Sequence, residues 1–261
     1  RFLRIFAHIF CKIMKKLYIL LCGATVALLM AACQGGKTAA ADDAEAGDTL
    51  EMKYAKLLTI VKHGDGEETS DAAEGIDYQY AEALVANPWK AGTMLHRYIL
   101  IPKGEEGDKT VAMLAKRRST GARCTTDTVR TPVERSAVFI APHCQLMYEL
   151  GCQQAIRGVC DLDYINIPDV KKRAALFGNT SAQNTIVNCG SSMAPDIERI
   201  IALKPEAILL SPFENSGGYG KLDKLHIPII EAADYMESSP LGRAEWMKFY
   251  GMLFGNEEGK S

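Results

Sequence analysis

Beyond Arg135, short apolar runs alternate with segments whose apolar residues recur at helical spacing. Helices or helical turns are predicted at HCQLMYELG, DVKKRAALFG, APDIERIIALK and YGKLDKL, and strands at SAVFIA, AIRGVC, TIVNCG, PEAILLS and IPIIEA. Strands that alternate with helices are typical of a parallel sheet flanked by helices. We therefore predict an α/β lobe over residues 135–236.

The segment APDIERIIALK gives the clearest helical pattern of this lobe. Pro195 suits the first turn of a helix, where its missing N–H removes no hydrogen bond. Ile197, Ile200, Ile201 and Leu203 recur at the spacing of a buried helix face. We expect all four side chains to point into the core.

Residues 51–134 have β character instead. Short apolar or alternating runs occur at KLLTIVKHG, IDYQYAEALVANPW and LHRYILIPKG. The charged stretch KGEEGDK predicts a solvated turn between strands. We predict a small antiparallel β section that precedes the lobe.

The last segment, SPLGRAEWMKFYGMLFG, predicts one helix within residues 237–261. Ser238 or Ser239 can cap its first turn, and Pro240 lies near that turn. Trp246, Phe249 and Leu253 share one face of such a helix.

The N-terminal part has the pattern of an export signal. Lys15 and Lys16 precede an apolar run over residues 17–30 that is short for a membrane span, and small residues then lead to Cys33. The stretch MAAC resembles a bacterial lipobox, which implies a lipoprotein signal peptide over residues 14–33 and lipidation of Cys33. The alternatives are an ordinary signal peptide with a chance cysteine and an N-terminal membrane anchor.

The flanking segments complete this organisation. Residues 1–13 precede Met14 and are expected to be an upstream extension, and residues 34–50 are small, polar and acidic, as in a flexible tether. We expect a protein in the periplasm, lipid-anchored to a bacterial membrane.

The composition and motifs disfavour several classes of function but do not identify one. The chain has 261 residues, 48% of them hydrophobic, which is enough for one good core or two small ones. The net charge of −2 disfavours nucleic acid as a partner. Neither a G-x-S-x-G elbow nor a G-x-G-x-x-G loop occurs, which disfavours an α/β-hydrolase and a dinucleotide site.

Five cysteines follow Cys33, and none forms a C-x-x-C pair. An odd number without such a pair gives little support to a zinc site or a disulfide framework. We expect buried free thiols that pack as small hydrophobes, with a reactive role as the alternative. They are Cys124, Cys144, Cys152, Cys160 and Cys189.

The stretch PDIERIIALKPEAILLS resembles a signature of the iron-complex and vitamin B12 class of periplasmic substrate-binding proteins, which deliver metal chelates to ABC importers. The segments NPW, YILIP, PHCQLMYELG, SPFEN, GGYGKL and SPLGRAEWMKFYGMLFG resemble the Bacteroides-type lipoproteins of this family, from about Tyr54 to Gly255. The resemblance implies two α/β lobes joined by a rigid helix that starts at SPLGRAEW. The second lobe is absent, so we expect a chain truncated after the first lobe.

Ligands of parallel α/β sheets bind beyond the carboxyl ends of the strands. In the loop after PEAILLS, Phe213 and Tyr219 offer flat apolar surface, and Asn215 offers hydrogen bonds. For Tyr164 the alternative is packing against the lobe. The expected ligand-binding residues, each in a loop beyond the carboxyl end of a strand, are Pro142, His143, Tyr164, Gly190, Ser191, Phe213, Asn215 and Tyr219.

The family resemblance implies an acidic residue near the cleft rim that pairs with the importer's permease. Glu214 is the nearest match, and a solvated loop acid is the alternative. We expect a monomeric binding protein without an intrinsic cofactor, metal site or catalytic residue of its own. Its ligand would be a corrinoid such as vitamin B12, haem or a ferric siderophore.

Two other functions stay open. One is a surface-anchored, metal-dependent enzyme that uses His143 with nearby cysteines. The other is a non-functional truncated remnant, which would expose apolar surface beside Trp246 and Phe249.

Overall fold

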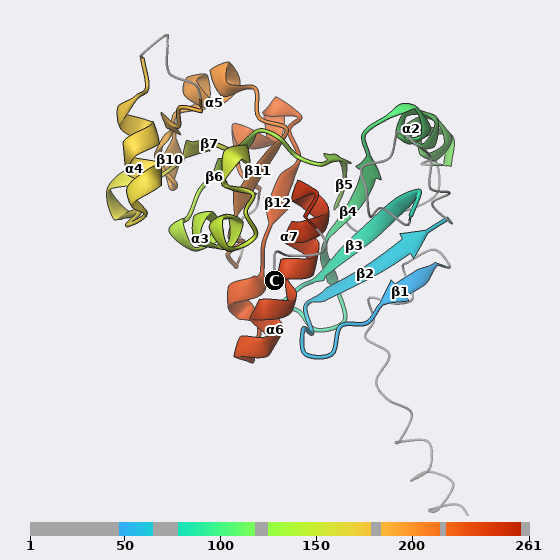
Figure 1. The fold of residues 1–261 in the computed structure, drawn as a ribbon. Coiled ribbons are helices and arrows are strands. Elements are labelled where there is room, and N and C mark those ends of the chain that lie inside the picture. Colours follow the sequence, from blue (N-terminus) through green and yellow to red (C-terminus); the bar gives the residue numbers. More distant parts are fainter. Residues whose placement is uncertain (1–46, 65–77, 118–124, 179–183, 215–217, 257–261) are drawn as a thin grey trace, which may run out of the picture. The chain divides into compact units, whose positions relative to one another are not determined.

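The computed structural model describes residues 47–64, 78–117, 125–178, 184–214 and 218–256 (Figure 1). They form a mixed sheet and a separate, wholly parallel sheet flanked by helices. The predicted α/β class, with an antiparallel β section ahead of a parallel sheet, is confirmed. The predicted signal peptide, Cys33, Cys124 and Asn215 lie outside the described residues.

The first sheet has the order β1-β2-β3-β4-β5. Its strands β1 to β4 pair antiparallel, as predicted, but β5 pairs with β4 in parallel. Strand β1 lies inside the range predicted as tether. The bounds are Asp48–Leu50 for β1, Leu58–His63 for β2, Tyr80–Ala86 for β3, Met94–Pro102 for β4 and Thr125–Thr131 for β5.

A helix that the sequence analysis missed makes the parallel crossover from β4 to β5. Helix α2 covers Glu105–Arg117, so the solvated turn predicted at KGEEGDK is wrong. Glu105, Glu106 and Asp108 occupy its first turn, where negative charge stabilises the helix dipole. Figure 1 shows α2 beside the strands of this sheet.

The second sheet has the order β12-β11-β6-β7-β8, and every pair in it is parallel. All residues of β6, β11 and β12 are buried, which agrees with a sheet covered on both faces. The bounds are Ser136–Val138 for β6, Ile156–Val159 for β7, Val187–Asn188 for β8, Ala207–Leu210 for β11 and Ile229–Glu231 for β12.

Helices cover both faces of this sheet. Val138 and Leu209 face one core with α3 and α4, and Ala137 and Ile208 face another core with α5. Within the described ranges, four single-turn 3-10 helices complete the connections. The bounds are Ala141–Glu149 for α3, Pro168–Ala175 for α4, Ile197–Leu203 for α5, Gln153–Ala155 for η2, Leu162–Tyr164 for η3, Leu222–Leu225 for η4 and Asp234–Met236 for η5.

Helix α5 differs from its prediction at two positions. Asp196 is its N-cap and accepts the Arg199 N–H, so Pro195 precedes the helix and belongs to a strand instead of the first turn. Ile200 is fully buried, but Ile201 is 52% exposed. The helix packs on β7 and β8, and Ile201 lies on the side away from them.

The C-terminal segment forms two helices rather than one. Helix α6 covers Pro240–Glu245 and α7 covers Met247–Phe254, with Trp246 between them. The Ser239 hydroxyl caps α6 by accepting the Gly242 N–H at 3.0 Å, as predicted. Trp246 and Phe249 are fully buried, so the exposed apolar surface expected of a remnant is not found at these residues.

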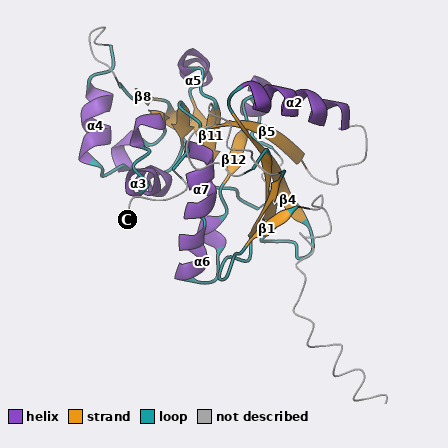
Figure 2. Cartoon of the chain, turned by 45° about the vertical axis from the view of Figure 1, so that its right-hand side comes forward, coloured by secondary structure: helices purple, strands orange, loops and turns teal. Residues whose placement is uncertain are grey.

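One apolar core joins the two sheets. It contains Leu100 of β4, Leu209 of β11 and Phe249 of α7. Figure 2 shows α7 between the two groups of strands. This shared core brings the end of β12 next to β4, which matters for the pocket described below.

Candidate functional site

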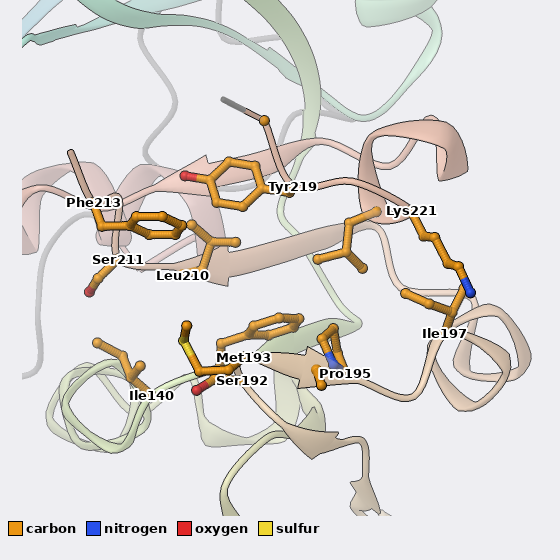
Figure 3. Close-up of a pocket in the computed structure, with 14 residues that line it drawn as sticks. Ile140, Ser192, Met193, Pro195, Ile197, Leu210, Ser211, Phe213, Tyr219 and Lys221 are labelled. Atoms are coloured by element: carbon orange, nitrogen blue, oxygen red, sulfur yellow. The ribbon is translucent and has the colours of Figure 1, made fainter. Parts of the chain in front are cut away.

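A pocket of about 600 Å³ opens at the carboxyl ends of β6 and β11 (Figure 3). This volume lies within the range of small-molecule sites. Phe139 and Ile140 follow β6, Leu210 ends β11 and Ser211 follows it. The pocket therefore occupies the place that a parallel α/β sheet provides for ligands.

Two aromatic side chains form one side of the pocket. Phe213 and Tyr219 meet edge to face, with ring centroids 6.4 Å apart. Phe213 is 50% exposed, so much of its ring is accessible to a ligand. The Tyr235 hydroxyl donates to the Pro212 carbonyl at 2.5 Å and anchors the loop just before Phe213. Both aromatic residues were predicted to bind ligand, and the structure brings them together.

A two-stranded hairpin forms the opposite side. Strands β9 (Gly190–Ser191) and β10 (Ala194–Pro195) pair antiparallel, and Met193 is at their turn. Figure 3 shows Met193 and Pro195 across the cavity from Phe213 and Tyr219. Met193 is 84% exposed, and an exposed thioether adapts well to the shape of an apolar ligand.

The hairpin is fastened to the loop after β7. The Asp161 N–H donates to the Gly190 carbonyl at 2.8 Å, and the Ser192 hydroxyl donates to the Asp161 carboxylate. Gly190 has a φ of +85°, which glycine adopts without strain. Of the predicted residues, Gly190 and Ser191 thus shape the hairpin and do not line the pocket.

The lining is mostly apolar with a few polar groups. Ser211 Oγ is buried and has no hydrogen-bond partner among the described residues. Lys221 is exposed and brings a positive charge to the end of the pocket beside Ile197. Such a site binds through apolar surface and orients its ligand with hydrogen bonds and one charge.

Three other predicted residues lie elsewhere. Pro142 and His143 belong to the first turn of α3 rather than to a loop, and His143 is fully buried. Its Nε2 lies 3.5 Å from Asp234 Oδ1, and its ring lies 6.0 Å from that of Tyr250. Tyr164, on η3, does not line the pocket. Its side chain is 84% exposed, so the alternative, packing against the lobe, is wrong.

Glu214 follows Phe213 and is exposed beside the pocket. Several lining residues escaped the sequence analysis. Those of the hairpin were missed because it has two-residue strands and no periodic pattern. The local signal was Gly190 followed by a small-residue stretch and Pro195. The missed residues are Phe139, Ile140, Ser192, Met193, Ala194, Pro195, Ile197, Leu210, Ser211, Gly218, Lys221 and Leu222.

The described cysteines are free thiols. Burial raises the pKa of Cys144 to about 12 and that of Cys189 to about 11, so both stay protonated at neutral pH. Within the described residues there is no group of three or more His, Cys, Asp or Glu side chains placed to hold a metal ion. Nor does this part of the chain contain a helix with the length and hydropathy of a membrane span.

No protein-family model matches the chain. Over 77 residues, or 29% of this chain, it is 32% identical to an uncharacterized lipoprotein of Methanocaldococcus jannaschii. That stretch is 19% of the relative's length, so the likeness concerns a small part of it.

Two solved structures resemble about half of the chain. The petrobactin-binding protein YclQ from Bacillus subtilis matches with a TM-score of 0.35 and 19% identity, over 50% of this chain and 41% of its own. The siderophore-binding protein BauB, solved with two molecules of acinetobactin and ferric iron, matches with a TM-score of 0.36 and 26% identity. The match covers 49% of this chain and 42% of BauB.

Proposed function

We propose that the protein is a substrate-binding lipoprotein of an ABC importer. It captures a metal chelate in the pocket bounded by Phe213, Tyr219 and Met193 and delivers it to the permease. The observation that carries this proposal is the pocket itself, an apolar and aromatic cavity at the carboxyl ends of parallel strands.

The segments that resemble the binding-protein family also contribute residues to this pocket. The stretch PDIERIIALKPEAILLS supplies Pro195 and Ile197 at one side of the pocket, and Leu210 and Ser211 at another. The segments SPFEN and GGYGKL add Phe213 and Tyr219. Residues that resemble the binding-protein family therefore line a pocket with the properties of a binding site.

The lining favours a ligand with a flat apolar surface. The aromatic rings of Phe213 and Tyr219 offer van der Waals and edge contacts to a conjugated ring system. Lys221 favours a ligand that also carries negative charge. A ferric siderophore, haem and a corrinoid each offer an extended ligand framework around a metal, and these remain the proposed chelates.

Delivery and anchoring belong to the same proposal. Glu214 is exposed beside the pocket, where a permease arginine can reach it. Lipidation of Cys33 would hold the protein at the periplasmic side of a bacterial membrane, and the curated relative is also described as a lipoprotein.

The enzyme alternative has less support. His143, on which it depends, lies outside the pocket and faces Asp234 and Tyr250. The polar side chains that line the pocket, Ser192, Ser211, Tyr219 and Lys221, suit binding and orientation.

Isothermal titration calorimetry tests the proposal. The purified chain is titrated separately with a ferric catecholate siderophore, haemin and cyanocobalamin. We expect saturable one-to-one binding of one of them. Absence of saturable binding by all three would contradict chelate capture by this chain.

A further inference from the structure

Residues outside the pocket lining hold Tyr219, one of the two aromatic residues that form a side of the pocket. The Tyr219 hydroxyl donates to Glu231 Oε1 at 2.6 Å, and its backbone N–H donates to Asp223 Oδ2 at 2.7 Å. Glu231 is the last residue of β12 and is buried. A buried carboxylate needs hydrogen bonds or an opposite charge, so the groups around Glu231 control where its oxygens point. They thereby control the orientation of the Tyr219 ring.

The second oxygen of Glu231 faces a histidine of the other sheet. His96 Nδ1 lies 3.1 Å from Glu231 Oε2, although 135 residues separate the two along the chain. His96 comes from β4 and is buried. Its ring stacks on Tyr98, with centroids 4.4 Å apart and an interplanar angle of 17°. Stacking fixes the plane of the imidazole and hence the direction of its Nδ1.

The Tyr98 side chain connects β4 to the backbone of β12 at this point. The Tyr98 hydroxyl donates to the Ile229 carbonyl at 2.9 Å and accepts the Glu231 N–H at 2.7 Å. Tyr98 is fully buried. The distance between His96 and Glu231 is therefore set by the packing of the two strands and not by flexible side chains alone.

Two further groups from β5 face the imidazole. Asp127 Oδ2 lies 3.2 Å from His96 Nε2, and Thr125 Oγ1 lies 2.9 Å from Nδ1. The ring therefore lies between two carboxylates, Glu231 and Asp127. Nδ1 meets hydrogen-bond geometry toward Glu231, whereas Nε2 lies at ion-pair distance from Asp127 without a hydrogen-bond partner among the described residues. An imidazolium, with a proton on each ring nitrogen, is attracted by both carboxylates.

The pKa of His96 agrees with this arrangement. Burial lowers the pKa, but the hydrogen bonds and negative charges of Asp127 and Glu231 outweigh burial and raise it above 6.5. Below this raised pKa the positive charge of His96 lies beside the carboxylate that holds Tyr219.

We infer that His96 is a positioning residue for the ligand pocket, which acts by holding Glu231 in the orientation that accepts the Tyr219 hydroxyl. Among the interactions described, His96 reaches the pocket lining through the carboxylate of Glu231. The inference rests on the proposed function for the ligand, but the link from His96 to Tyr219 exists in the ligand-free protein.

Two conservative variants separate positioning from mere stability. The amide nitrogen of asparagine occupies the place of His Nδ1, so His96→Asn keeps a donor toward Glu231. The amide nitrogen of glutamine occupies the place of Nε2, so His96→Gln keeps a donor toward Asp127 and loses the one toward Glu231.

His63 provides the matched control. It is buried in β2 of the same sheet, stacks on Tyr80 with centroids 4.5 Å apart, and has Nε2 3.7 Å from Glu82 Oε1. Its surroundings resemble those of His96, but neither His63 nor Glu82 contacts a residue of the pocket lining among the interactions described. His63→Gln therefore reports the general cost of replacing a buried histidine.

The first readout is fluorine NMR of the ligand-free full chain labelled with fluorotyrosine. Tyr219→Phe identifies the Tyr219 resonance, because that resonance disappears in the variant. We expect His96→Gln to move it, and His96→Asn and His63→Gln to leave it in place. An unmoved Tyr219 resonance in His96→Gln would overturn the inference whatever the protein binds.

The second readout is the affinity of the apolar fluorescent probe anilinonaphthalene sulfonate, whose anionic group suits Lys221. Loss of one hydrogen bond behind the pocket wall should weaken binding about three- to tenfold in His96→Gln, with recovery in His96→Asn. Equal affinity in His96→Gln and wild type would overturn the link to the pocket. If the Tyr219 resonance moves as expected but no chelate binds the wild type, the proposed function fails and the positioning role stands.

Discussion

The indole N–H of Trp246 donates to Glu237 Oε1 at 3.1 Å, and both residues are buried. The same carboxylate accepts the backbone N–H groups of Lys56 and Leu57 at 2.9–3.0 Å. Glu237 therefore joins the segment before β2 to the junction of α6 and α7. This junction belongs to the core that the two sheets share.

Glu237→Ala should lower the free energy of unfolding by about 2–4 kcal/mol, because it leaves several donors without an acceptor in a buried place. Urea unfolding followed by circular dichroism measures the change. Glu198→Ala, at an exposed glutamate of α5, is the control and should change stability by less than about 0.5 kcal/mol. Similar stabilities for the two variants would refute this role of Glu237.

Arg173 connects α4 to η2, to the start of β7 and to the segment before β8 through three carbonyls. Its Nε, Nη1 and Nη2 donate to Asn184, Gln153 and Ile156 at 2.7–2.8 Å. Lysine cannot reproduce this fork, so Arg173→Lys should lower the unfolding free energy by about 2–3 kcal/mol. Lys172→Ala, at the exposed neighbour, should cost less than about 0.5 kcal/mol in the same urea experiment. A fully stable Arg173→Lys protein would mean that the carbonyl contacts contribute little.

Gly107 allows α2 to approach the end of β4. A Cβ at this position would lie 1.9 Å from the Pro102 carbonyl oxygen, which belongs to the backbone and cannot turn away. Gly107→Ala should therefore destabilise the protein by about 2–4 kcal/mol, despite the higher helix propensity of alanine. Thermal unfolding compares it with Glu105→Ala at an exposed position of the same turn. A Gly107→Ala protein as stable as wild type would show that α2 begins differently.

His96 should make stability depend on pH above 6.5. Its pKa is raised in the folded protein, so its contribution is complete below the unfolded value near 6.5 and is lost as the pH rises through the folded value. The facing groups are Asp127 and Thr125 from β5, Glu231 from β12 and the stacked Tyr98. Urea midpoints measured from about pH 5.5 to about pH 9 should fall more steeply in wild type than in His96→Asn. Parallel profiles would contradict an imidazolium at this place.

The sequence predicted the parallel sheet well because β6, β11 and β12 are short apolar runs with turn residues around them. It also identified Phe213 and Tyr219, since both follow a buried strand in a glycine-rich loop. It placed His143 in a strand-end loop, but α3 begins at Ala141 and turns this side chain into the core. A shift of a few residues at an element boundary thus changed which side chains line the pocket.

Other features depend on contacts that periodicity does not encode. Helix α2 starts in a charged, glycine-containing stretch that has the composition of a turn. The β9–β10 hairpin is held by Asp161 from a different loop. No sequence motif marks His96, and only the pairing of β4 with β5 and the packing of β4 on β12 reveal its two carboxylates.

The central claim is that the pocket beside Phe213 binds a metal chelate, and one pair of phenylalanine variants tests it most directly. Phe213 is 50% exposed at the pocket, and Phe177 is 56% exposed at the end of α4, away from the pocket lining. The measurement is the calorimetric dissociation constant of the chelate that the wild type binds. We predict that Phe213→Ala weakens binding about tenfold through loss of aromatic contact and that Phe177→Ala leaves it unchanged. Equal affinities for both variants and the wild type would contradict the claim.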